Sequence, residues 1–380
     1  MTDEHADGDG AAIGGHRRSL ALALVTPGFP PDFGGVESVV AALASHLARR
    51  GHRVDVLAHA RHGQPPSVST PDDGVDVTVR RFPDRTRTRR FEVAPSLWRH
   101  LHRNGDRYDV VHAHSFHVTA SLAAAVASTA PLVFTPHYHG VGHTTAARAA
   151  HVVYDVIASR IFTRARAVIC VSHAEAALVV RDYPQAAAKI TVIPNGVNVE
   201  EISAATPLET DRPVVLVAGR LEHYKQVDLA IRAAALMDTD VTLAIAGGGP
   251  QAGALAALVD GLGLSHRVRL LGQLSTDDLR RWQRTASVTL CLSRHEAFGL
   301  TLLEAAAAGS HVVATSIAAH VEVASSAGVD AVMLDVDVHP DVVAAAVETA
   351  LSETRPAPLD VPTWQDVAAR TEDVLAAAAR

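Results

Sequence analysis

Residues 287–309 have the sequence SVTLCLSRHEAFGLTLLEAAAAG. The first six residues form a short apolar run bounded by polar ones, which predicts a buried strand. An alanine-rich helix is expected to open near residues 298–301, so a short loop that contains Glu296 joins the two elements. A buried strand followed at once by a helix is the repeating unit of a parallel sheet covered by helices.

The same alternation of short apolar runs and alanine-rich stretches covers most of the chain and predicts the α/β class. A polar segment at residues 199–212 separates two series of strands and is interpreted as a linker. We therefore predict two doubly wound, Rossmann-like domains, residues 19–198 and 213–362, which face each other across a cleft. The expected strands are 19–26, 53–58, 75–80, 109–114, 132–135, 167–171, 190–193, 214–218, 241–246, 268–271, 287–292 and 311–314.

The ends of the chain are expected to differ from these domains. Residues 1–18 are polar and glycine-rich, which predicts a disordered leader. They are acidic before they become basic, the reverse of the charge order in a signal peptide. Residues 363–380 are expected to form a helix that could pack on either domain and could cross back to the first.

Composition excludes several classes of protein. The chain has 380 residues and a net charge of −7, so no overall basic field would attract nucleic acid. No apolar run reaches the roughly 18 to 20 residues that a membrane span requires. Cys170 and Cys291 lie in separate apolar stretches, as expected for buried thiols in a reducing compartment. We therefore expect a cytoplasmic protein.

Two glutamates flank the expected helix start. Backbone N–H groups at a helix N-terminus, together with the positive end of its dipole, favour an anion such as a diphosphate. Glu296 precedes this start and could accept hydrogen bonds from sugar hydroxyls, whereas Glu304 lies further along the helix and could hold a ribose diol. The alternative for either glutamate is a solvated helix carboxylate. The backbone that would receive the anion belongs to Phe298, Gly299, Leu300 and Thr301.

Basic residues follow another expected strand, in the segment GRLEHYK at residues 219–225. The forked guanidinium of Arg220 and the ammonium of Lys225 would complement a diphosphate leaving group, whose charge grows as a glycosidic bond breaks. A solvated basic loop is the alternative, although Lys225 is one of only two lysines in the chain. This loop is therefore a second candidate for anion binding.

Glycines follow two further strands. Gly34 and Gly35 lie between the first strand and the first helix, where a missing side chain lets backbone approach a phosphate. Gly247 begins a Gly-Gly-Gly-Pro segment that could serve in the same way or form only a tight turn. Neither segment matches the G-x-G-x-x-G or G-x-x-x-x-G-K-[ST] phosphate-binding pattern.

Histidines gather at two neighbouring strand ends. A histidine pair at such a place could bind a metal ion, so a metal-dependent hydrolase that uses His112, His114, His137 and His139 is a competing class of function. Alternatively, one histidine could hydrogen-bond a substrate hydroxyl, and we favour His137, with His114 and His139 beside the acceptor. The histidines at these ends are His112, His114, His117, His137, His139 and His143.

Two other charged segments have simpler interpretations. Asp335-Val-Asp337 matches the D-x-D with which metal-dependent nucleotide-sugar enzymes of another fold hold a divalent ion, but a solvated turn also accounts for it. The basic segment RRFPDRTRTRR at residues 80–90, continued to Arg103, could contact an anionic membrane surface or an acidic acceptor. A solvated or mobile loop is the alternative.

In this order the motifs resemble the retaining glycosyltransferases of family 4 (glycosyltransferase group 1), which have the GT-B fold. The resemblance covers most of the chain from about residue 20 and is most specific in the second half. There the family's pattern S-x-x-E-x-F-G-L…E-A-x-A-x-G matches residues 293–309. Further matches are LAIAGGGP at 243–250, LGL at 262–264, RVRLLG at 267–272 and PNGVN at 194–198.

The resemblance implies a role for each candidate in the second domain. Arg220 and Lys225 would bind the donor diphosphate, assisted by the backbone of residues 298–301. Glu304 would hold the ribose, and Glu296 would contact the transferred sugar. His137 and Gly35 would complete the site from the opposite domain.

The family implies retention of anomeric configuration by front-face attack, without a metal, a cofactor or a separate nucleophile. Three positions depart from its pattern: Gln226 follows the lysine in place of glycine or asparagine, Leu292 replaces proline, and Ala318-Ala319 replaces a glycine pair. The last change bears on the sugar, because this loop lies beside the donor in relatives.

The expected reaction moves a hexose or N-acetylhexosamine, most commonly from UDP, to a hydroxyl of a small acceptor. Relatives glycosylate lipids, polysaccharide precursors, cyclitols and antibiotic cores, so a lipid or polysaccharide precursor stays an alternative. The preference for arginine over lysine suggests an actinobacterium-like source, which favours a cyclitol, aminocyclitol or natural-product acceptor in antibiotic biosynthesis. A GT-B-fold sugar-nucleotide epimerase is a further alternative.

Overall fold

The computed structural model describes residues 18–32, 34–60, 67–69, 75–83, 93–116, 119–140 and 158–380. Residues 1–17 of the expected leader lie outside this range. A sheet forms in the first half of the chain, with strand order β3-β4-β2-β1-β5-β6-β7-β8, and β3 alone among these strands pairs antiparallel, with β4. The strands are β1 (Ala21–Thr26), β2 (Arg53–Ala60), β3 (Ser67–Ser69), β4 (Val77–Pro83), β5 (Val110–His114), β6 (Leu132–Thr135), β7 (Ala167–Cys170) and β8 (Ile190–Val192).

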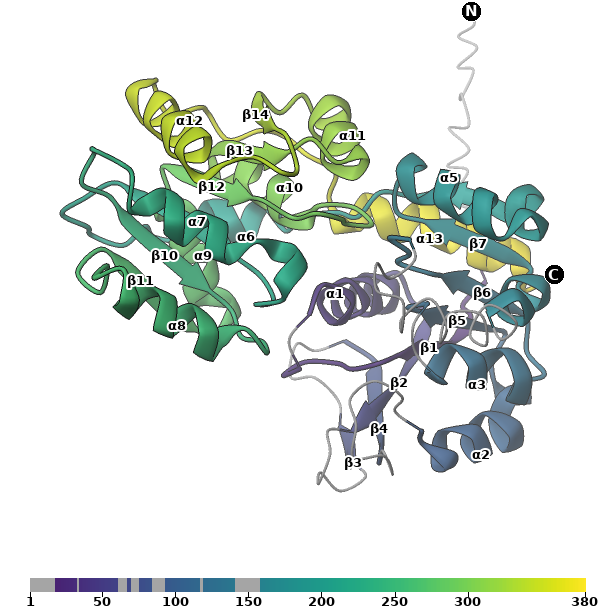
Figure 1. Ribbon diagram of the computed structural model, residues 1–380. Helices are drawn as coiled ribbons and strands as arrows, with labels where there is room; N and C mark the ends of the chain where they lie inside the picture. The colour runs from purple at the N-terminus through teal and green to yellow at the C-terminus, as the bar shows by residue number, and fades with distance from the viewer. Residues whose placement is uncertain are drawn as a thin grey trace, which may run out of the picture.

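A second sheet forms in the other half, with strand order β11-β10-β9-β12-β13-β14, and its described pairings are all parallel. The two sheets belong to separate lobes of the molecule (Figure 1). The fold is therefore two Rossmann-like α/β domains, as predicted. The strands are β9 (Val214–Ala218), β10 (Thr242–Ala246), β11 (Val268–Gly272), β12 (Val288–Cys291), β13 (His311–Thr315) and β14 (Ala331–Leu334).

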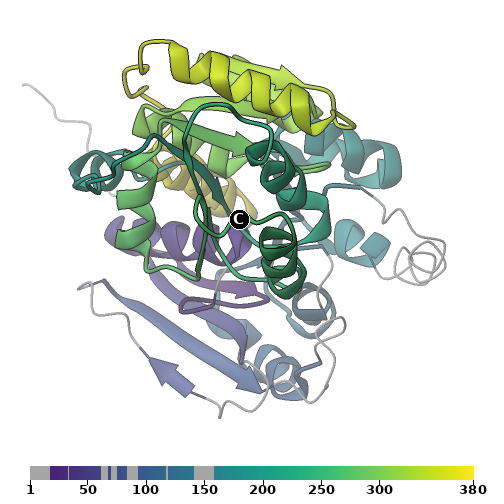
Figure 2. The same ribbon diagram turned by 60° about the vertical axis from the view of Figure 1, so that its left-hand side comes forward.

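Helices cover both faces of each sheet, which is why the strands are nearly continuous apolar runs. In the second domain α12 lies on the side away from the first domain (Figure 2). The helices are α1 (Gly35–Arg49), α2 (Pro95–Asn104), α3 (Thr119–Ala127), α5 (His173–Asp182), α6 (Val199–Ala204), α7 (Val227–Ala234), α8 (Ala252–Gly261), α9 (Thr276–Thr285), α10 (Leu300–Ala308), α11 (Ala318–Ala327), α12 (Pro340–Ser352) and α13 (Trp364–Ala378), with short 3₁₀ turns η1 (Gly105–Arg107), η2 (Pro184–Lys189) and η3 (His223–Lys225).

Two strands and one helix were not predicted. β3 has the polar sequence Ser-Val-Ser and exists because its backbone pairs with β4, so it carries no hydrophobic pattern. β14 is an edge strand with mixed exposure, which weakens its apolar signal. The first part of the expected linker forms α6, which packs against α9 and α10 of the second domain.

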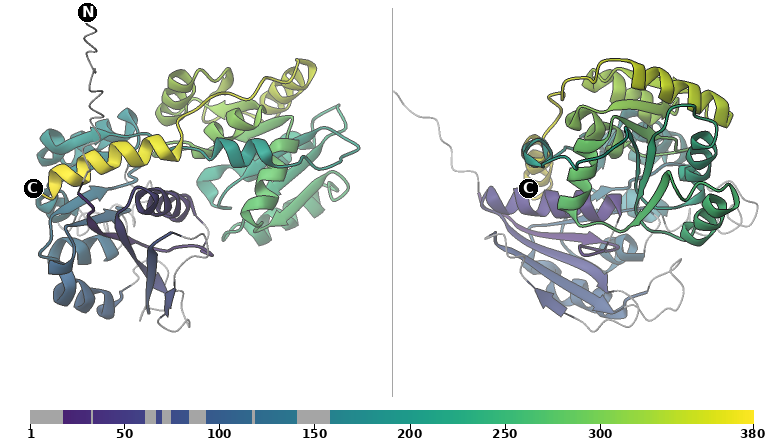
Figure 3. Two further views of the ribbon diagram at one scale, coloured as in Figure 1. Left: turned by 180° about the vertical axis from the view of Figure 1, so that it is seen from behind. Right: turned by 90° about the vertical axis from the view of Figure 1, so that its left-hand side faces the viewer.

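The last helix returns to the first domain. α13 packs against α1, and Trp364 at its start is buried with residues of β1 and β2. Figure 3 (left) shows this helix, in yellow, lying along the first domain. The backbone at Gly196 packs tightly against the start of α13, because a Cβ at Gly196 would lie 2.5 Å from the backbone of Thr363 and Trp364. No helix within the described ranges is long and apolar enough to cross a bilayer.

Candidate active site

Loops from both domains meet at the carboxyl ends of their central strands. His139 follows β6 of the first domain, whereas Tyr224 follows β9 and His295 follows β12 of the second. The three rings stack: the centroids of His139 and His295 are 4.8 Å apart, and those of Tyr224 and His295 are 4.4 Å apart. These contacts identify the strand ends as the place where residues of both domains can act on one ligand.

Lys225 and Glu296 form an ion pair in this region, Nζ to Oε1, and both side chains are about one-fifth exposed, 20% and 19%. Ser293 Oγ donates a second hydrogen bond to the same Glu296 oxygen at 2.7 Å. Burial favours the neutral carboxyl, but the Lys225 charge and the two hydrogen bonds outweigh it and lower the pKa of Glu296. Burial likewise opposes the charge of Lys225, while Glu296 raises the pKa of the ammonium above its usual range. Both groups are therefore held in their charged forms.

The predicted helix start is α10, which begins at Leu300. Its cap residue Gly299 has φ 108°, a left-handed conformation that favours glycine, and a Cβ at Gly299 would lie 2.9 Å from His320 Cδ2. His320 is buried and its Nδ1 hydrogen-bonds the Thr315 carbonyl at 3.0 Å. The first N–H groups of a helix have no acceptor within it, so those of Leu300 and Thr301 are available to an anion.

Glu304 lies one turn further along α10 and accepts a 2.9 Å hydrogen bond from Gln283 Nε2 of α9. Burial raises the pKa of Glu304 to about 7, against the opposing effects of Gln283 and Arg280. This carboxyl therefore titrates near neutral pH, whereas Glu296, which belongs to the same motif, stays ionised.

Three histidines of the first domain lie together at the ends of β5 and β6, where His112 and His114 are buried and His137 is partly exposed. His114 Nδ1 lies 3.4 Å from His137 Nε2, and His112 Nε2 hydrogen-bonds Thr135 Oγ1 at 2.8 Å. Burial lowers the pKa of His112 to about 3 and that of His137 to about 4, and it holds the pKa of His114 well below its usual range. All three rings are therefore neutral at pH 7.

His137 has φ 49°, a conformation that only a few per cent of residues other than glycine adopt. The neighbouring Tyr138 ring is fully buried among aromatic side chains of the first domain, and its hydroxyl donates to Asp182 Oδ2 at 2.8 Å. Packing of Tyr138 therefore holds His137 in this conformation, at the end of a strand that faces the second domain.

The metal-binding alternative gains nothing from this geometry. Within the described part of the chain, no group of three or more His, Cys, Asp or Glu side chains is arranged to hold a metal ion. His139 stacks on His295 rather than joining the buried histidines. Asp335 Oδ1 accepts from the Asp337 backbone at 2.9 Å, and Asp337 pairs with Arg294 at 2.7 Å, so the D-x-D forms a turn.

The remaining predicted residues have varied surroundings. Arg220 is 52% exposed and pairs with Glu222 at 2.8 Å. Gly247 has φ 141°, and a Cβ there would overlap the carbonyl of Gly219, so close backbone packing already requires glycine at this turn. Gly34 caps α1, and a Cβ at this position would overlap Glu37.

Gly35 is the first residue of α1, and a Cβ there would meet nothing within 4 Å. Three predicted features extend beyond the described residues. His117 and His143 lie outside them, as do residues 84–92 of the basic segment.

Four residues that sequence reasoning did not single out contact the predicted ones: Tyr224, Gln283, His295 and His320. Tyr224 and His295 are neighbours of Lys225 and Glu296, so their position in the motifs was an available signal. Gln283 and His320 reach Glu304 and Gly299 across 21 residues of sequence, and no local pattern indicates such contacts.

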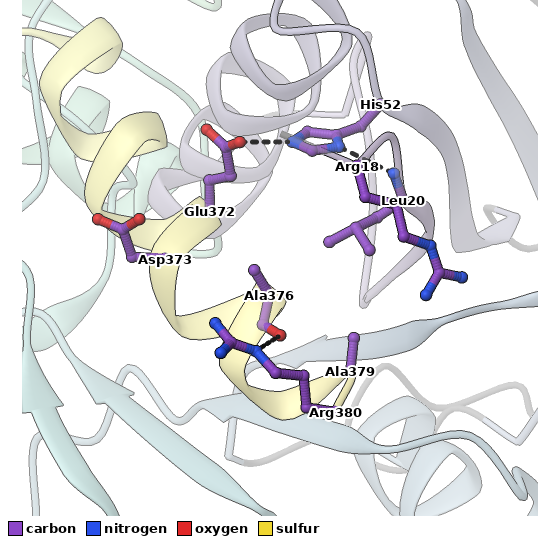
Figure 4. A pocket seen from close by; sticks show the side chains of 8 residues that line it. All are labelled: Arg18, Leu20, His52, Glu372, Asp373, Ala376, Ala379 and Arg380. Atoms are coloured by element: carbon purple, nitrogen blue, oxygen red, sulfur yellow. Dashed lines mark hydrogen bonds and ion pairs between the residues drawn. The ribbon is translucent and has the colours of Figure 1, made fainter. Parts of the chain in front are cut away.

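A cavity of about 360 Å³ lies elsewhere in the first domain and is lined in part by His52 and Glu372 (Figure 4). His52 Nδ1 accepts from the backbone of Leu20, just before β1. The cavity therefore borders the amino ends of the strands, opposite the end where parallel sheets bind ligands. It is separate from the candidate site.

Comparison with known proteins finds a matching family model for each domain. Residues 33–201 match the model of the family described as Glycosyltransferase Family 4, and residues 198–360 match that of Glycosyl transferases group 1. A human phosphatidylinositol N-acetylglucosaminyltransferase subunit is 28% identical, over 96% of this chain and 81% of its own. D-inositol 3-phosphate glycosyltransferase 1 of Catenulispora acidiphila is 29% identical, over 84% of each chain.

Solved structures show the same fold. A sucrose-phosphate synthase from Thermosynechococcus elongatus superposes with a TM-score of 0.71 at 20% identity, covering 95% of this chain and 94% of the other. HepE of Anabaena, in complex with UDP-glucose, superposes with a TM-score of 0.68 at 21% identity, covering 93% and 96%. At this identity the likeness shows the two-domain fold.

Proposed function

The chain belongs to the family 4, group 1 glycosyltransferases, and from this premise we propose that it moves a hexose or N-acetylhexosamine from a UDP-sugar to a hydroxyl of a cyclitol-type acceptor with retention. The chain is a glycosyltransferase of the kind that uses nucleotide-sugar donors. What we propose beyond this is the donor, the acceptor and the stereochemistry.

One observation carries the proposal: Lys225, in the turn η3 after β9, pairs with Glu296, which lies on the loop that leads into the N-terminus of α10. Leaving-group departure from a UDP-sugar places negative charge on the diphosphate. The Lys225 ammonium and the N–H groups of Leu300 and Thr301 are donors fixed before the reaction, so they stabilise that charge without reorganising. Glu296, kept ionised, accepts hydrogen bonds from sugar hydroxyls on the other side of Lys225.

Two further residues complete the donor site in this proposal. Glu304, half ionised near pH 7, accepts from the ribose hydroxyls, and Arg220 can exchange Glu222 for a phosphate because its guanidinium is half exposed. Gly34, Gly35 and Gly247 provide backbone close to the donor.

His137 is proposed to contact the transferred sugar from the first domain, with His114 and His139 beside the acceptor. A neutral imidazole can donate one hydrogen bond and accept another, which suits contact with hydroxyls. Retention is then expected by front-face attack, in which an oxygen of the departing phosphate takes the acceptor proton. No protein nucleophile and no metal ion are required in this scheme.

The acceptor class rests on the relatives. The names of the human and Catenulispora proteins specify phosphatidylinositol and D-inositol 3-phosphate. We infer an inositol-like cyclitol or aminocyclitol for this chain, and a lipid-linked inositol is the second candidate that the human relative favours.

A two-step experiment tests this function. A thermal-shift panel of nucleotides and nucleotide sugars identifies the donor first, because a ligand that binds the native state raises its apparent stability. The protein is then incubated with this donor and one acceptor: myo-inositol, inositol phosphate, an aminocyclitol or phosphatidylinositol in micelles. NMR determines the anomeric configuration of the product. An α-linked product from an α-linked donor supports retention, and an inverted product contradicts it.

The same assay separates the competing classes. Conversion of one UDP-sugar to another without an acceptor would identify an epimerase. Loss of activity with a chelator, together with a stoichiometric metal bound through His112 and His114, would favour the hydrolase.

A further inference from the structure

The first turn of α5 is the place where the two domains are joined by hydrogen bonds close to the candidate site. α5 belongs to the first domain, and its first N–H groups have no acceptor within the helix. Glu322 of α11, in the second domain, supplies two acceptors: Oε1 accepts from the His173 N–H at 2.6 Å, and Oε2 accepts from the Ala174 N–H at 2.7 Å. A carboxylate at a helix N-terminus is favoured by both the hydrogen bonds and the dipole.

A second contact reaches the donor loop itself. Ser172 caps α5 by accepting from the Glu175 N–H at 2.9 Å, and its hydroxyl donates to the Ala297 carbonyl at 2.7 Å. Ser172 is fully buried. Ala297 follows Glu296 directly, so one hydroxyl ties the start of α5 to the residue proposed to hold the sugar.

A third contact leads from the same turn to His137. Glu175 is buried, and its Oε1 accepts from the Tyr138 N–H at 2.5 Å while its Oε2 accepts from the Val171 N–H at 2.6 Å. Tyr138 is the residue after His137. The turn at residues 171–175 therefore connects the loop of His137, the loop of Glu296 and helix α11.

We propose that Glu322 is a positioning residue, which holds the two halves of the site at the distance that sugar transfer requires. Its two carboxylate oxygens accept hydrogen bonds from the α5 backbone, which is not part of the proposed donor or acceptor site. It acts by clamping α5 to α11, so that Ser172 can meet Ala297 and Glu175 can hold the His137 loop in one geometry. This inference rests on the proposed function for its effect on turnover, although the clamp itself is a contact between domains.

The consequence for catalysis follows from where the donor binds. Apart from Gly34 and Gly35, the residues proposed to bind the donor lie in the second domain, so loss of the clamp should leave UDP affinity nearly unchanged. Turnover requires His137 and Glu296 at the correct distance and orientation to each other, and a misplacement of about 1 Å can reduce turnover by roughly 10²-fold. Glu322→Ala is therefore expected to lower kcat at least 10-fold, with the UDP dissociation constant within about 2-fold of the unmodified chain.

Two variants accompany it. Glu322→Gln keeps the side-chain length and one carbonyl oxygen, so it retains one of the two hydrogen bonds and should give an intermediate kcat. Glu348→Ala is the matched control, because Glu348 Oε1 accepts from the Asp238 and Thr239 N–H groups at 2.6 and 3.2 Å within the second domain alone. It removes the same kind of contact without touching the domain boundary, and kcat should not change.

The distance between domains is measured independently of activity. Val126→Cys and Leu236→Cys place spin labels on exposed positions of the first and second domains, 58% and 55% exposed, and the native Cys170 and Cys291 are buried. Electron spin resonance should give one narrow distance distribution in the labelled background and in Glu348→Ala. Glu322→Ala should give a broader distribution shifted to longer distances.

The proposal requires that Glu322→Ala both lowers kcat and broadens the distance distribution. A distance distribution that Glu322→Ala leaves unaltered overturns the clamp, and unaltered kcat with a broadened distribution overturns the positioning role. If Glu322→Ala weakens UDP binding by as much as it lowers kcat, Glu322 belongs to the donor site, and the positioning role is overturned. If the unmodified chain transfers no sugar, the proposed function fails, while the spin-label distances still decide the clamp.

Discussion

At the scale of single residues, the two lysines of the chain have different surroundings. Lys225 is paired with Glu296 at the candidate site, whereas Lys189 donates to the carbonyls of Phe162 and Thr163 in the first domain. Lys225→Ala should weaken UDP binding by roughly 10- to 100-fold, since a hydrogen bond to a charged group contributes about 1.5 to 3 kcal/mol. It should also lower kcat by about 10²-fold.

Titration calorimetry with UDP and initial rates check this prediction. Lys189→Ala is the control and should leave both quantities unchanged. Equal UDP affinity in the two variants would remove Lys225 from the diphosphate site.

Glu304 makes donor binding depend on pH. Its pKa is raised to about 7 by burial, and a ribose diol donates hydrogen bonds to the ionised form. UDP affinity should therefore rise between pH 6 and pH 8, as the free protein loses the proton that opposes binding. Calorimetry at these pH values measures the slope, and Glu304→Gln should flatten it. An unchanged slope in that variant would show that another group is responsible.

The three clustered histidines of the first domain make the stability of the fold depend on pH below about 6.5. His112, His114 and His137 have pKa values lowered from 6.5, so between pH 6.5 and about 4 the unfolded chain binds protons that the folded chain does not. Burial raises the pKa of Glu175 and of Glu304, so these two carboxyls act in the opposite direction. The contribution of the three rings to the free energy of unfolding should be greatest above pH 6.5 and fall by about 1.4 kcal/mol per pH unit for each neutral ring as the pH decreases.

Urea unfolding at pH 7, 6 and 5 measures this fall. His112→Leu should reduce its slope by one proton. A slope that is the same in the His112 variant would contradict the prediction.

At the scale of elements, α10 depends on its glycine cap. Gly299 has φ 108°, and a Cβ would be 2.9 Å from His320, so Gly299→Ala should destabilise the fold by about 1 to 3 kcal/mol and weaken UDP binding. Gly253 in α8 has an open surrounding and no left-handed φ, so Gly253→Ala should stabilise by about 0.5 to 1 kcal/mol.

Opposite signs in the two variants are the expected result, measured by chemical unfolding. A stable Gly299→Ala variant with full UDP affinity would show that the α10 start tolerates a side chain.

At the scale of the whole molecule, the C-terminal helix belongs to the first domain. Trp364 is 5% exposed and packs with the core of β1, β2 and α1. Trp364→Ala should cost about 3 to 5 kcal/mol. Because this core lies in the first domain, limited proteolysis should cleave that domain first, while UDP should still protect the second. Trp282 is partly buried in the second domain, and Trp282→Ala should reverse the order of cleavage.

The sequence alone determined the α/β class, the two sheets and the helix start within residues 293–309. Each depends on local pattern: buried parallel strands are continuous apolar runs, and residues 293–309 place Glu296, Gly299 and Glu304 around one helix start. Strand ends were predicted well because the apolar runs stop where the backbone leaves the sheet, as at β6 and β9. Strand β3 was not predicted, because backbone pairing at the edge of a sheet needs no apolar side chain.

Only the tertiary structure decided which distant residues share a contact. The pairing of Lys225 with Glu296, the support of Glu304 by Gln283, and the contact of Glu322 with α5 span 21 to 149 residues. The first arises because parallel strands bring their carboxyl ends to one edge, whatever their separation along the chain. The other two join helices, α9 with α10 and α11 with α5, that only the packing of the folded chain brings together. The α13 crossing likewise depends on packing, since Trp364 is buried in the core of the first domain, and no local pattern indicates which domain would receive it.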